Sequence, residues 1–239
     1  MSTQTHNIDP AEQARFDELA ASWWDPEGES RPLHELNPAR LRFITERVGL
    51  HDATVVDIGC GGGILSEALA AQGANVTGID IANRALAVAR LHLEESGVTV
   101  TYTESTAEDF AAAQPQSCEV VCCMELLEHV PDPASVVQSC GELLKEGGHC
   151  FLSTLNRTPS AFAMAIVGAE HVMGLIPKGT HRFDRFIRPS ELSAWLRNAG
   201  LKVMEITGLH YNPLTRSARV GGAVSINYLV HAVKLSAKP

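Results

Sequence analysis

A glycine-rich turn between a short strand and a helix constrains the fold of this chain more than any other stretch. Residues 53–58 are mostly apolar or β-branched, four of the five residues at 59–63 are glycine, and residues 64–71 have a helical pattern. Glycine permits positive φ angles and leaves no Cβ between the backbone and a ligand. Because the helix N-terminus behind such a turn favours polar ligands, the segment predicts a nucleoside-binding loop.

A second strand, 75–80, ends in Asp80, where a doubly wound α/β fold places the carboxylate that accepts hydrogen bonds from ribose hydroxyls. Glycines occupy the first, third and fifth positions of the turn, from Gly59, whereas a dinucleotide fingerprint requires glycine at the sixth, which is Ile64. The turn is therefore similar to motif I of the class I methyltransferases that use S-adenosylmethionine (SAM).

Composition excludes several classes of protein. The 239 residues are 45% hydrophobic, which is enough for the core of one α/β domain, and the formal net charge of −9 argues against a nucleic-acid partner. Six cysteines show no paired C-x-x-C spacing of a zinc site, and the first 25 residues carry acidic side chains without an apolar signal-peptide core. We therefore expect a cytoplasmic protein.

Strands and helices alternate along most of the chain. This pattern predicts a doubly wound, mostly parallel, seven-stranded sheet within a SAM-binding domain at 51–239. An N-terminal helical cap is expected at 1–50, and an apolar insertion at 155–188 follows the fifth strand.

The cap contains one candidate site residue. Asn37 and Pro38 are typical of an N-cap and a first helical position, so they predict a helix that begins there and runs through Arg47. Arg40 would then lie in the first turn, where a cation gains nothing from the helix dipole. An anionic partner such as the cofactor carboxylate would explain Arg40, and a surface arginine is the alternative.

A second polar cluster follows the strand at 118–124. Glu125, Glu128 and His129 have helical i, i+3 and i+4 spacing, which predicts that one turn directs all three the same way. Such a set can bind a divalent metal or supply a general base for a hydroxyl substrate. A solvated polar face is the alternative.

Six segments together closely resemble the ubiquinone biosynthesis O-methyltransferases, and they spread over nearly the whole chain. They are Asp57–Leu65, Met124–Pro133, Ser153–Arg157, Pro177–His181, Thr207–Pro213 and Ser22–Asp25. The paired tryptophans of the last segment and the His-Tyr-Asn-Pro run before residue 214 are much more specific than the glycine turn.

The resemblance implies methylation of a polyprenyl catechol, 2-polyprenyl-6-hydroxyphenol, and of 3-demethylubiquinol. It also implies that SAM contacts Arg40, Gly59, Asp80 and Met124. The glycine turn adds Gly61 to these expected contacts. Eukaryotic relatives are associated with Mg²⁺, whose site would map to Glu125, Glu128 and His129. We expect His129, with Glu128, to act as the base.

Three other functions are consistent with parts of this pattern. A class I methyltransferase for a soluble small-molecule hydroxyl would share the glycine turn but would not act on prenylated catechols. An NAD-dependent dehydrogenase would be stabilised by a nicotinamide cofactor instead of SAM. A non-catalytic SAM-binding subunit would methylate no catechol on its own.

The insertion suggests contact with a membrane surface. Between 155 and 190 there are five Lys or Arg residues and two acidic residues, a local net charge of +3, beside an apolar run at 161–169. This composition predicts peripheral binding to anionic lipid on the inner face of the membrane, and a buried lid helix is the alternative. Other proteins of the ubiquinone pathway are candidate partners.

Overall fold

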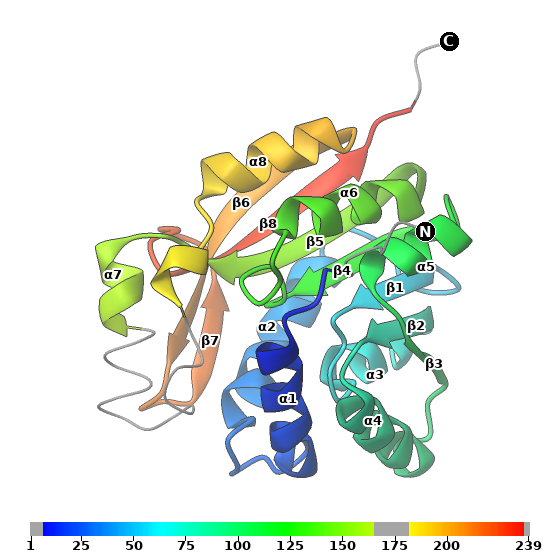
Figure 1. The fold of residues 1–239 in the computed structure, drawn as a ribbon, viewed down its shortest axis with the longest axis vertical. Coiled ribbons are helices and arrows are strands. Elements are labelled where there is room, and N and C mark those ends of the chain that lie inside the picture. The colour runs from blue at the N-terminus through cyan, green and yellow to red at the C-terminus, as the bar shows by residue number, and fades with distance from the viewer. Residues whose placement is uncertain (1–6, 165–181, 237–239) are drawn as a thin grey trace.

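The computed structural model describes residues 7–164 and 182–236, which fold around one eight-stranded sheet (Figure 1). The strand order is β3-β2-β1-β4-β5-β8-β6-β7. The strands are β1 Thr54–Ile58, β2 Asn75–Asp80, β3 Val100–Glu104, β4 Cys118–Met124, β5 Leu144–Leu155, β6 Leu201–Asn212, β7 Ser217–Val220 and β8 Asn227–Lys234.

The five strands from β3 to β5 in this order pair in parallel. Strand β8 runs antiparallel to both β5 and β6. The doubly wound, mostly parallel α/β prediction is confirmed, but the predicted number of seven strands is one too few. The missed strand, β7, pairs antiparallel with the end of β6. Its four residues, Ser217–Val220, contain no apolar run, so nothing in the local sequence identifies it.

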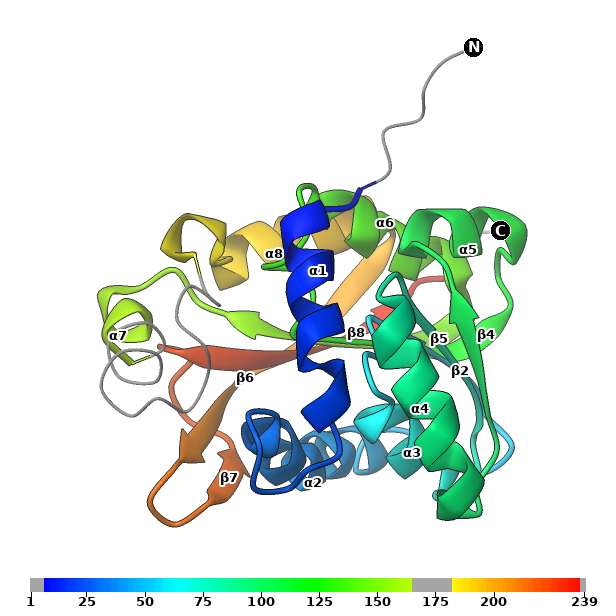
Figure 2. The same ribbon diagram turned by 60° about the horizontal axis from the view of Figure 1, so that its bottom comes forward.

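Helices cover both faces of the sheet (Figure 2). On one face α5, α6 and α8 contribute to the largest buried cluster, and on the other α2, α3 and α4 pack on the same strands. The helices are α1 Pro10–Leu19, α2 Arg31–Thr45, α3 Ile64–Ala70, α4 Asn83–Ser96, α5 Ala107–Ala113, α6 Pro133–Leu143, α7 Pro159–Ala161 and α8 Pro189–Asn198. Because helices cover both faces of the sheet, a ligand can reach the strands only at their ends.

The start predicted for the second helix of the cap is wrong. Helix α2 begins at Arg31, and Pro38 lies inside it. The Asn37 side chain caps no helix but donates a hydrogen bond to the Ile64 carbonyl at 3.1 Å. Leu33 and Leu36 pack into buried clusters, and their burial offsets the hydrogen bond that an internal proline removes. Arg40 therefore lies in the middle of α2.

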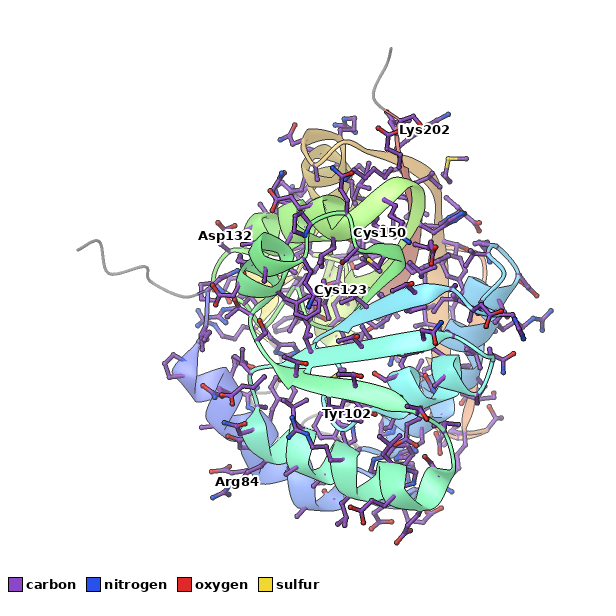
Figure 3. The ribbon with its side chains drawn as sticks, turned by 90° about the vertical axis from the view of Figure 1, so that its right-hand side faces the viewer. Arg84, Tyr102, Cys123, Asp132, Cys150 and Lys202 are labelled. Carbon is purple, nitrogen blue, oxygen red and sulfur yellow. The ribbon has the colours of Figure 1, made fainter. Side chains whose placement is uncertain are left out.

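All six cysteines are buried and reduced. Figure 3 shows Cys123 on β4 and Cys150 on β5 inside the molecule. They contribute to the apolar cluster below α5, α6 and α8. These two cysteines thus act as small apolar core residues.

Candidate active site

A cavity of about 390 Å³ opens at the carboxyl ends of the parallel strands. The order of the strands reverses at this place. The chain adds β2 and β3 on one side of β1 and then returns to add β4 on the other side. Open α/β sheets bind ligands at such a switch point. Helix α1 crosses this edge of the sheet (Figure 2) and supplies one wall.

The structure brings most of the predicted site residues into this cavity. The lining residues include Arg40, Gly59, Gly61, Asp80, Met124, Glu125 and His129. Glu128 is not among them. Much of the remaining wall is apolar and includes Leu36, Leu209 and Ile226.

The glycine turn holds backbone conformations that other residues rarely adopt. Gly59 has φ of +71° and Gly61 has φ of +52°. An ideal Cβ on Gly61 would lie 2.3 Å from Cζ2 of Trp23, so position 61 lacks both the conformation and the space for a side chain. The bare backbone of the turn consequently forms part of the cavity wall.

Asp80, at the end of β2, fixes this turn. Its Oδ2 accepts the Gly61 N–H and its Oδ1 accepts the Ala82 N–H, each at 2.8 Å. Burial raises the pKa of Asp80, and the two backbone donors oppose that shift. Each carboxylate oxygen keeps a second lone pair. Asp80 can therefore hold the turn and also accept two ligand hydroxyls.

A second carboxyl group, Asp57, lies at the end of β1. It is 2% exposed and accepts a hydrogen bond from Ser66 Oγ at 2.6 Å. Burial raises the pKa of Asp57 to about 7, and the charge of Asp80 adds to the shift. A large fraction of Asp57 is therefore protonated at neutral pH.

The paired tryptophans secure the cap on the glycine turn. Trp23 is 7% exposed and lines the cavity beside Gly61. Trp24 donates its indole N–H to the Gly62 carbonyl at 2.8 Å and stacks on His92, with ring centroids 3.4 Å apart. Trp23 is thus both a packed anchor and part of the cavity wall, whereas Trp24 is an anchor.

Arg40 is a buried cation at the cavity wall. It is 5% exposed, and its Nη2 lies 3.2 Å from Glu125 Oε1. Within the described residues, Nε and Nη2 of Arg40 have no hydrogen-bond partner. The ion pair with Glu125 thus leaves part of this buried guanidinium without a hydrogen-bond acceptor, which is costly, and a carboxylate ligand in the cavity would supply one. The site therefore fits the amino-acid end of SAM.

The residues after Met124 do not form the predicted helical turn. The Glu125 N–H donates to the Ser153 carbonyl at 3.1 Å, which extends the β4–β5 pairing, and Glu125 then takes a left-handed conformation with φ of +57°. Its carboxylate accepts hydrogen bonds from Ser153 Oγ at 2.7 Å and Asn227 Nδ2 at 3.0 Å. The expectation that Glu125, Glu128 and His129 point the same way is wrong, because their i, i+3, i+4 spacing has that meaning only on a continuous helix.

Glu128 lies behind the cavity wall. It is 4% exposed, and its Oε2 accepts a hydrogen bond from Thr154 Oγ1 at 2.8 Å. Burial and then the charge of Glu125 raise its pKa to about 7. Glu128 therefore has no direct contact with the space that a substrate would occupy.

His129 lines the cavity and is paired with a carboxylate of the N-terminal cap. Its Nδ1 lies 2.8 Å from Glu12 Oε2, and both residues are 8% exposed. Phe16 packs edge-on against the imidazole, with ring centroids 5.1 Å apart. The arrangement is a buried imidazole–carboxylate pair at a cavity wall, which suits proton transfer.

The arrangement does not support the predicted metal site. Among residues 7–164 and 182–236, no group of three or more His, Cys, Asp or Glu side chains is placed to hold an ion. Glu125 is engaged by Arg40, Glu128 lies behind the wall, and His129 is engaged by Glu12. Three side chains with separate partners do not form the oxygen-rich shell that Mg²⁺ requires.

Two members of the site were missed in the sequence. Glu12 has no motif around it, so the sequence gave no reason to single it out. Asn227, which holds Glu125, lies at the start of the last strand and also has no local signal.

Half of the predicted insertion, residues 165–181, falls outside the described residues, and so does its apolar run beyond Met164. Arg185, at its far end, donates hydrogen bonds to Asp9 and to the His129 carbonyl. In the part of the chain that the structure describes, no helix is both long and apolar enough to span a bilayer.

Comparisons with known proteins agree with this geometry. The family model of a methyltransferase domain matches residues 29–206. A ubiquinone biosynthesis O-methyltransferase of Saccharophagus degradans is 54% identical over 98% of this chain and 100% of its own length. One from Pseudomonas aeruginosa is 57% identical over 94% of this chain and 97% of its own.

The fold is also found in solved structures. The magnesium protoporphyrin IX methyltransferase of Synechocystis, solved with bound SAH, superposes with a TM-score of 0.68 at 18% identity. The match covers 92% of this chain and 94% of that one. At this identity the likeness concerns the fold alone.

Proposed function

The chain belongs to the family of ubiquinone biosynthesis O-methyltransferases, and we propose that its cavity methylates a phenolic oxygen of prenylated catechols and quinols. The chain is a SAM-dependent O-methyltransferase of ubiquinone biosynthesis. We propose 2-polyprenyl-6-hydroxyphenol and 3-demethylubiquinol as its two acceptors.

The strand ends on one side of the cavity would hold the cofactor. SAM supplies an electrophilic methyl group on its sulfonium when it is bound. Asp80 would accept the ribose hydroxyls, the backbone of Gly59 and Gly61 would lie against the nucleoside, and Met124 would give an apolar contact. Arg40 would pair with the carboxylate of the amino-acid end.

His129 would act on the acceptor. A phenol has a pKa of about 10, by analogy with tyrosine, and is mostly protonated at neutral pH. In this proposal the phenolic proton passes to the imidazole, and the oxygen lone pair forms the new O–CH₃ bond. The electron pair of the breaking C–S bond stays on sulfur. Glu128 would support the turn that carries His129 and would not touch the acceptor.

One observation carries this proposal. The carboxylate suited to a ribose, Asp80, and a buried imidazole, His129, line the same largely apolar cavity. A cofactor and an aromatic acceptor would therefore meet in one largely apolar space. Orientation of the reacting atoms in such a site accounts for a large share of catalysis.

The test is transfer of labelled methyl from SAM to a short-prenyl demethylubiquinol under reducing conditions, with and without chelator. We expect turnover by the wild type in both conditions, because the proposed base is the imidazole of His129, which is paired with Glu12 and not with a metal ion. His129→Ala should lower kcat by about 10²–10⁴-fold while SAM affinity is kept, since the base acts on the other substrate. His51→Ala is the matched control, because the His51 side chain is 84% exposed. Full activity of His129→Ala would contradict the assignment of the base.

We also propose that the protein binds peripherally to anionic lipid through residues 155–188. The acceptor resides in the bilayer, and the local net charge of +3 between 155 and 190 supports this binding. Flotation with vesicles should show association with anionic but not zwitterionic lipid, and added salt should weaken it. A wild-type chain that never floats with anionic vesicles would contradict the proposal.

A further inference from the structure

We infer that Glu12 is a positioning residue for His129: it accepts the Nδ1–H and thereby fixes the tautomer and orientation of the imidazole. The inference rests on the proposed function, in which His129 takes the phenolic proton. It adds to that function a residue of the N-terminal cap that never touches the reacting atoms itself.

The geometry of the pair determines which group donates. Burial alone would raise the pKa of Glu12, but the hydrogen bond from His129 and the nearby charges of Arg15 and Arg185 help to bring it below its ordinary value. Glu12 is therefore a carboxylate at neutral pH and can only accept. The 2.8 Å contact consequently requires the proton on Nδ1, which leaves the lone pair of a neutral ring on Nε2.

Glu12 acts from a firmly held helix. Arg15 pairs with its carboxylate at 3.3 Å, and Phe16, on the same side of α1, packs edge-on against the imidazole. The ring is thus held by a hydrogen bond at one nitrogen and by an aromatic contact. A small shift of α1 would change both constraints together.

The backbone of the turn is tied to the same helix. Arg185 donates to the His129 carbonyl at 3.3 Å and to Asp9 Oδ2 at 2.7 Å, and Asp9 caps α1. On the other side, Asn7 exchanges hydrogen bonds with the Asp132 backbone at 2.7 and 2.8 Å. The distance between Glu12 and His129 is therefore set by contacts on both sides of the turn.

A free neutral histidine favours the opposite tautomer, with its proton on Nε2. That form could not accept a proton at Nε2 from a bound phenol. A carboxylate that accepts the Nδ1–H disfavours the Nε2–H tautomer. It also stabilises the imidazolium that forms during proton transfer. We therefore expect loss of Glu12 to affect turnover far more than SAM binding.

The decisive variant is Glu12→Gln, which keeps the volume of the side chain. An amide can rotate and present its NH₂ to Nδ1, so it permits the Nε2–H tautomer that a carboxylate forbids. We expect kcat to fall about 10–100-fold with SAM affinity within about two-fold of wild type. Glu12→Ala should lose at least as much. Glu18→Gln, the same change at an exposed position of α1, should leave kcat unchanged.

Nitrogen-15 NMR of the histidine ring gives a readout that does not depend on activity. Wild-type His129, assigned by its absence in His129→Ala, should show the Nδ1–H tautomer, and Glu12→Gln should move it toward Nε2–H. Glu18→Gln should not. A purely structural role for Glu12 would leave both the tautomer and kcat of the Gln variant unchanged, because packing is kept.

The outcomes separate this inference from the proposed function. Wild-type kcat and an unchanged tautomer in Glu12→Gln, beside an impaired His129→Ala, would overturn the positioning role alone. Full activity of His129→Ala would overturn the proposed function of His129 and the inference together. Loss of turnover in Glu12→Gln with a shifted tautomer and intact SAM binding would support it.

Discussion

The two ends of the cavity are built in different ways. The cofactor end is one continuous piece of chain from Gly59 to Asp80, held by backbone hydrogen bonds that close the turn on the strand end. The acceptor end is assembled from side chains far apart in sequence, such as Glu12 and His129. The first is formed by neighbouring segments of the fold, whereas the second also depends on where α1 packs.

This difference predicts two kinds of mutational effect. Changes at the cofactor end should lower SAM affinity and stability together, because the same backbone serves both. Changes at the acceptor end should alter turnover while the sheet and the cofactor site remain intact. Variants at Gly61, Asp80 and Arg40 test the division, in decreasing order of expected effect.

Gly61→Ala should have the largest effect. The φ of +52° costs a non-glycine residue about 1–2 kcal/mol, and the contact with Trp23 at 2.3 Å adds overpacking of about 1–3 kcal/mol. We expect SAM binding, measured by calorimetry, to fall at least 100-fold and the melting temperature to drop by several degrees.

Two further variants identify the cause. Gly49→Ala is the matched control, because an added Cβ there meets nothing within 4 Å. Trp23→Ala combined with Gly61→Ala should recover part of the lost stability if the clash is real. Unchanged affinity and stability in Gly61→Ala would break the link between turn geometry and cofactor binding.

Asp80→Ala should have the next largest effect. The change removes the acceptor for the Gly61 and Ala82 N–H groups and, in the proposed complex, for two ribose hydroxyls. Each buried group left unpaired costs about 1–3 kcal/mol, so SAM affinity should fall at least several-fold while the fold persists. Asp52→Ala, at an exposed side chain, is the control. Equal SAM affinity in both variants would show that Asp80 serves only the turn.

Arg40 lies between the two ends and should combine both effects. Arg40→Met leaves Glu125 without its cation, which should cost about 1–3 kcal/mol of stability, and removes the proposed partner of the cofactor carboxylate. Adding Glu125→Gln should restore stability, since no unpaired charge remains, but should not restore SAM affinity. Recovery of both properties would place Arg40 at the acceptor end alone.

The contrast between the ends also explains what the sequence could predict. A turn that is continuous in sequence can be recognised from its spacing, and Gly59, Gly61 and Asp80 were identified in this way and do line the cavity. Glu12 and His129 are 117 positions apart, and only the tertiary fold brings them together. No local pattern contains that information.

Two local signals were overridden by tertiary contacts. Asn37 and Pro38 have the pattern of a helix start, but burial of Leu33 and Leu36 extends α2 back to Arg31. The spacing from Glu125 to His129 is helical, but pairing of Glu125 with β5 prevents a helix there. In both cases the burial or pairing of nearby residues determined the backbone conformation. The argument from residue spacing had assumed that conformation in advance.

The smallest expected effect concerns a feature that the two ends share. Each end hides one carboxyl group that accepts a single hydroxyl, Asp57 from Ser66 and Glu128 from Thr154, and in each the pKa is raised to about 7. A raised folded-state pKa means that the native state binds the proton more tightly than the unfolded chain. The resulting stabilisation is complete below about pH 4 and is lost as pH rises through 7.

Asp57→Asn and Glu128→Gln remove this titration and keep a hydrogen-bond acceptor. Relative to wild type, each variant should therefore be more stable at pH 8 than at pH 5, by a few degrees in melting temperature at roughly 2–4 °C per kcal/mol. The charge of Glu125 is the second cause of the raised pKa of Glu128, after burial. The neighbouring charges that shift the pKa of Asp57 are instead those of Asp80 and Arg40. Adding Glu125→Gln should thus shrink the pH dependence of the Glu128 variant and leave that of the Asp57 variant unchanged. If Glu125→Gln changed the pH dependence of stability equally in the Asp57 and Glu128 variants, its charge would act on both carboxyl groups. The division into two independent ends would then be wrong.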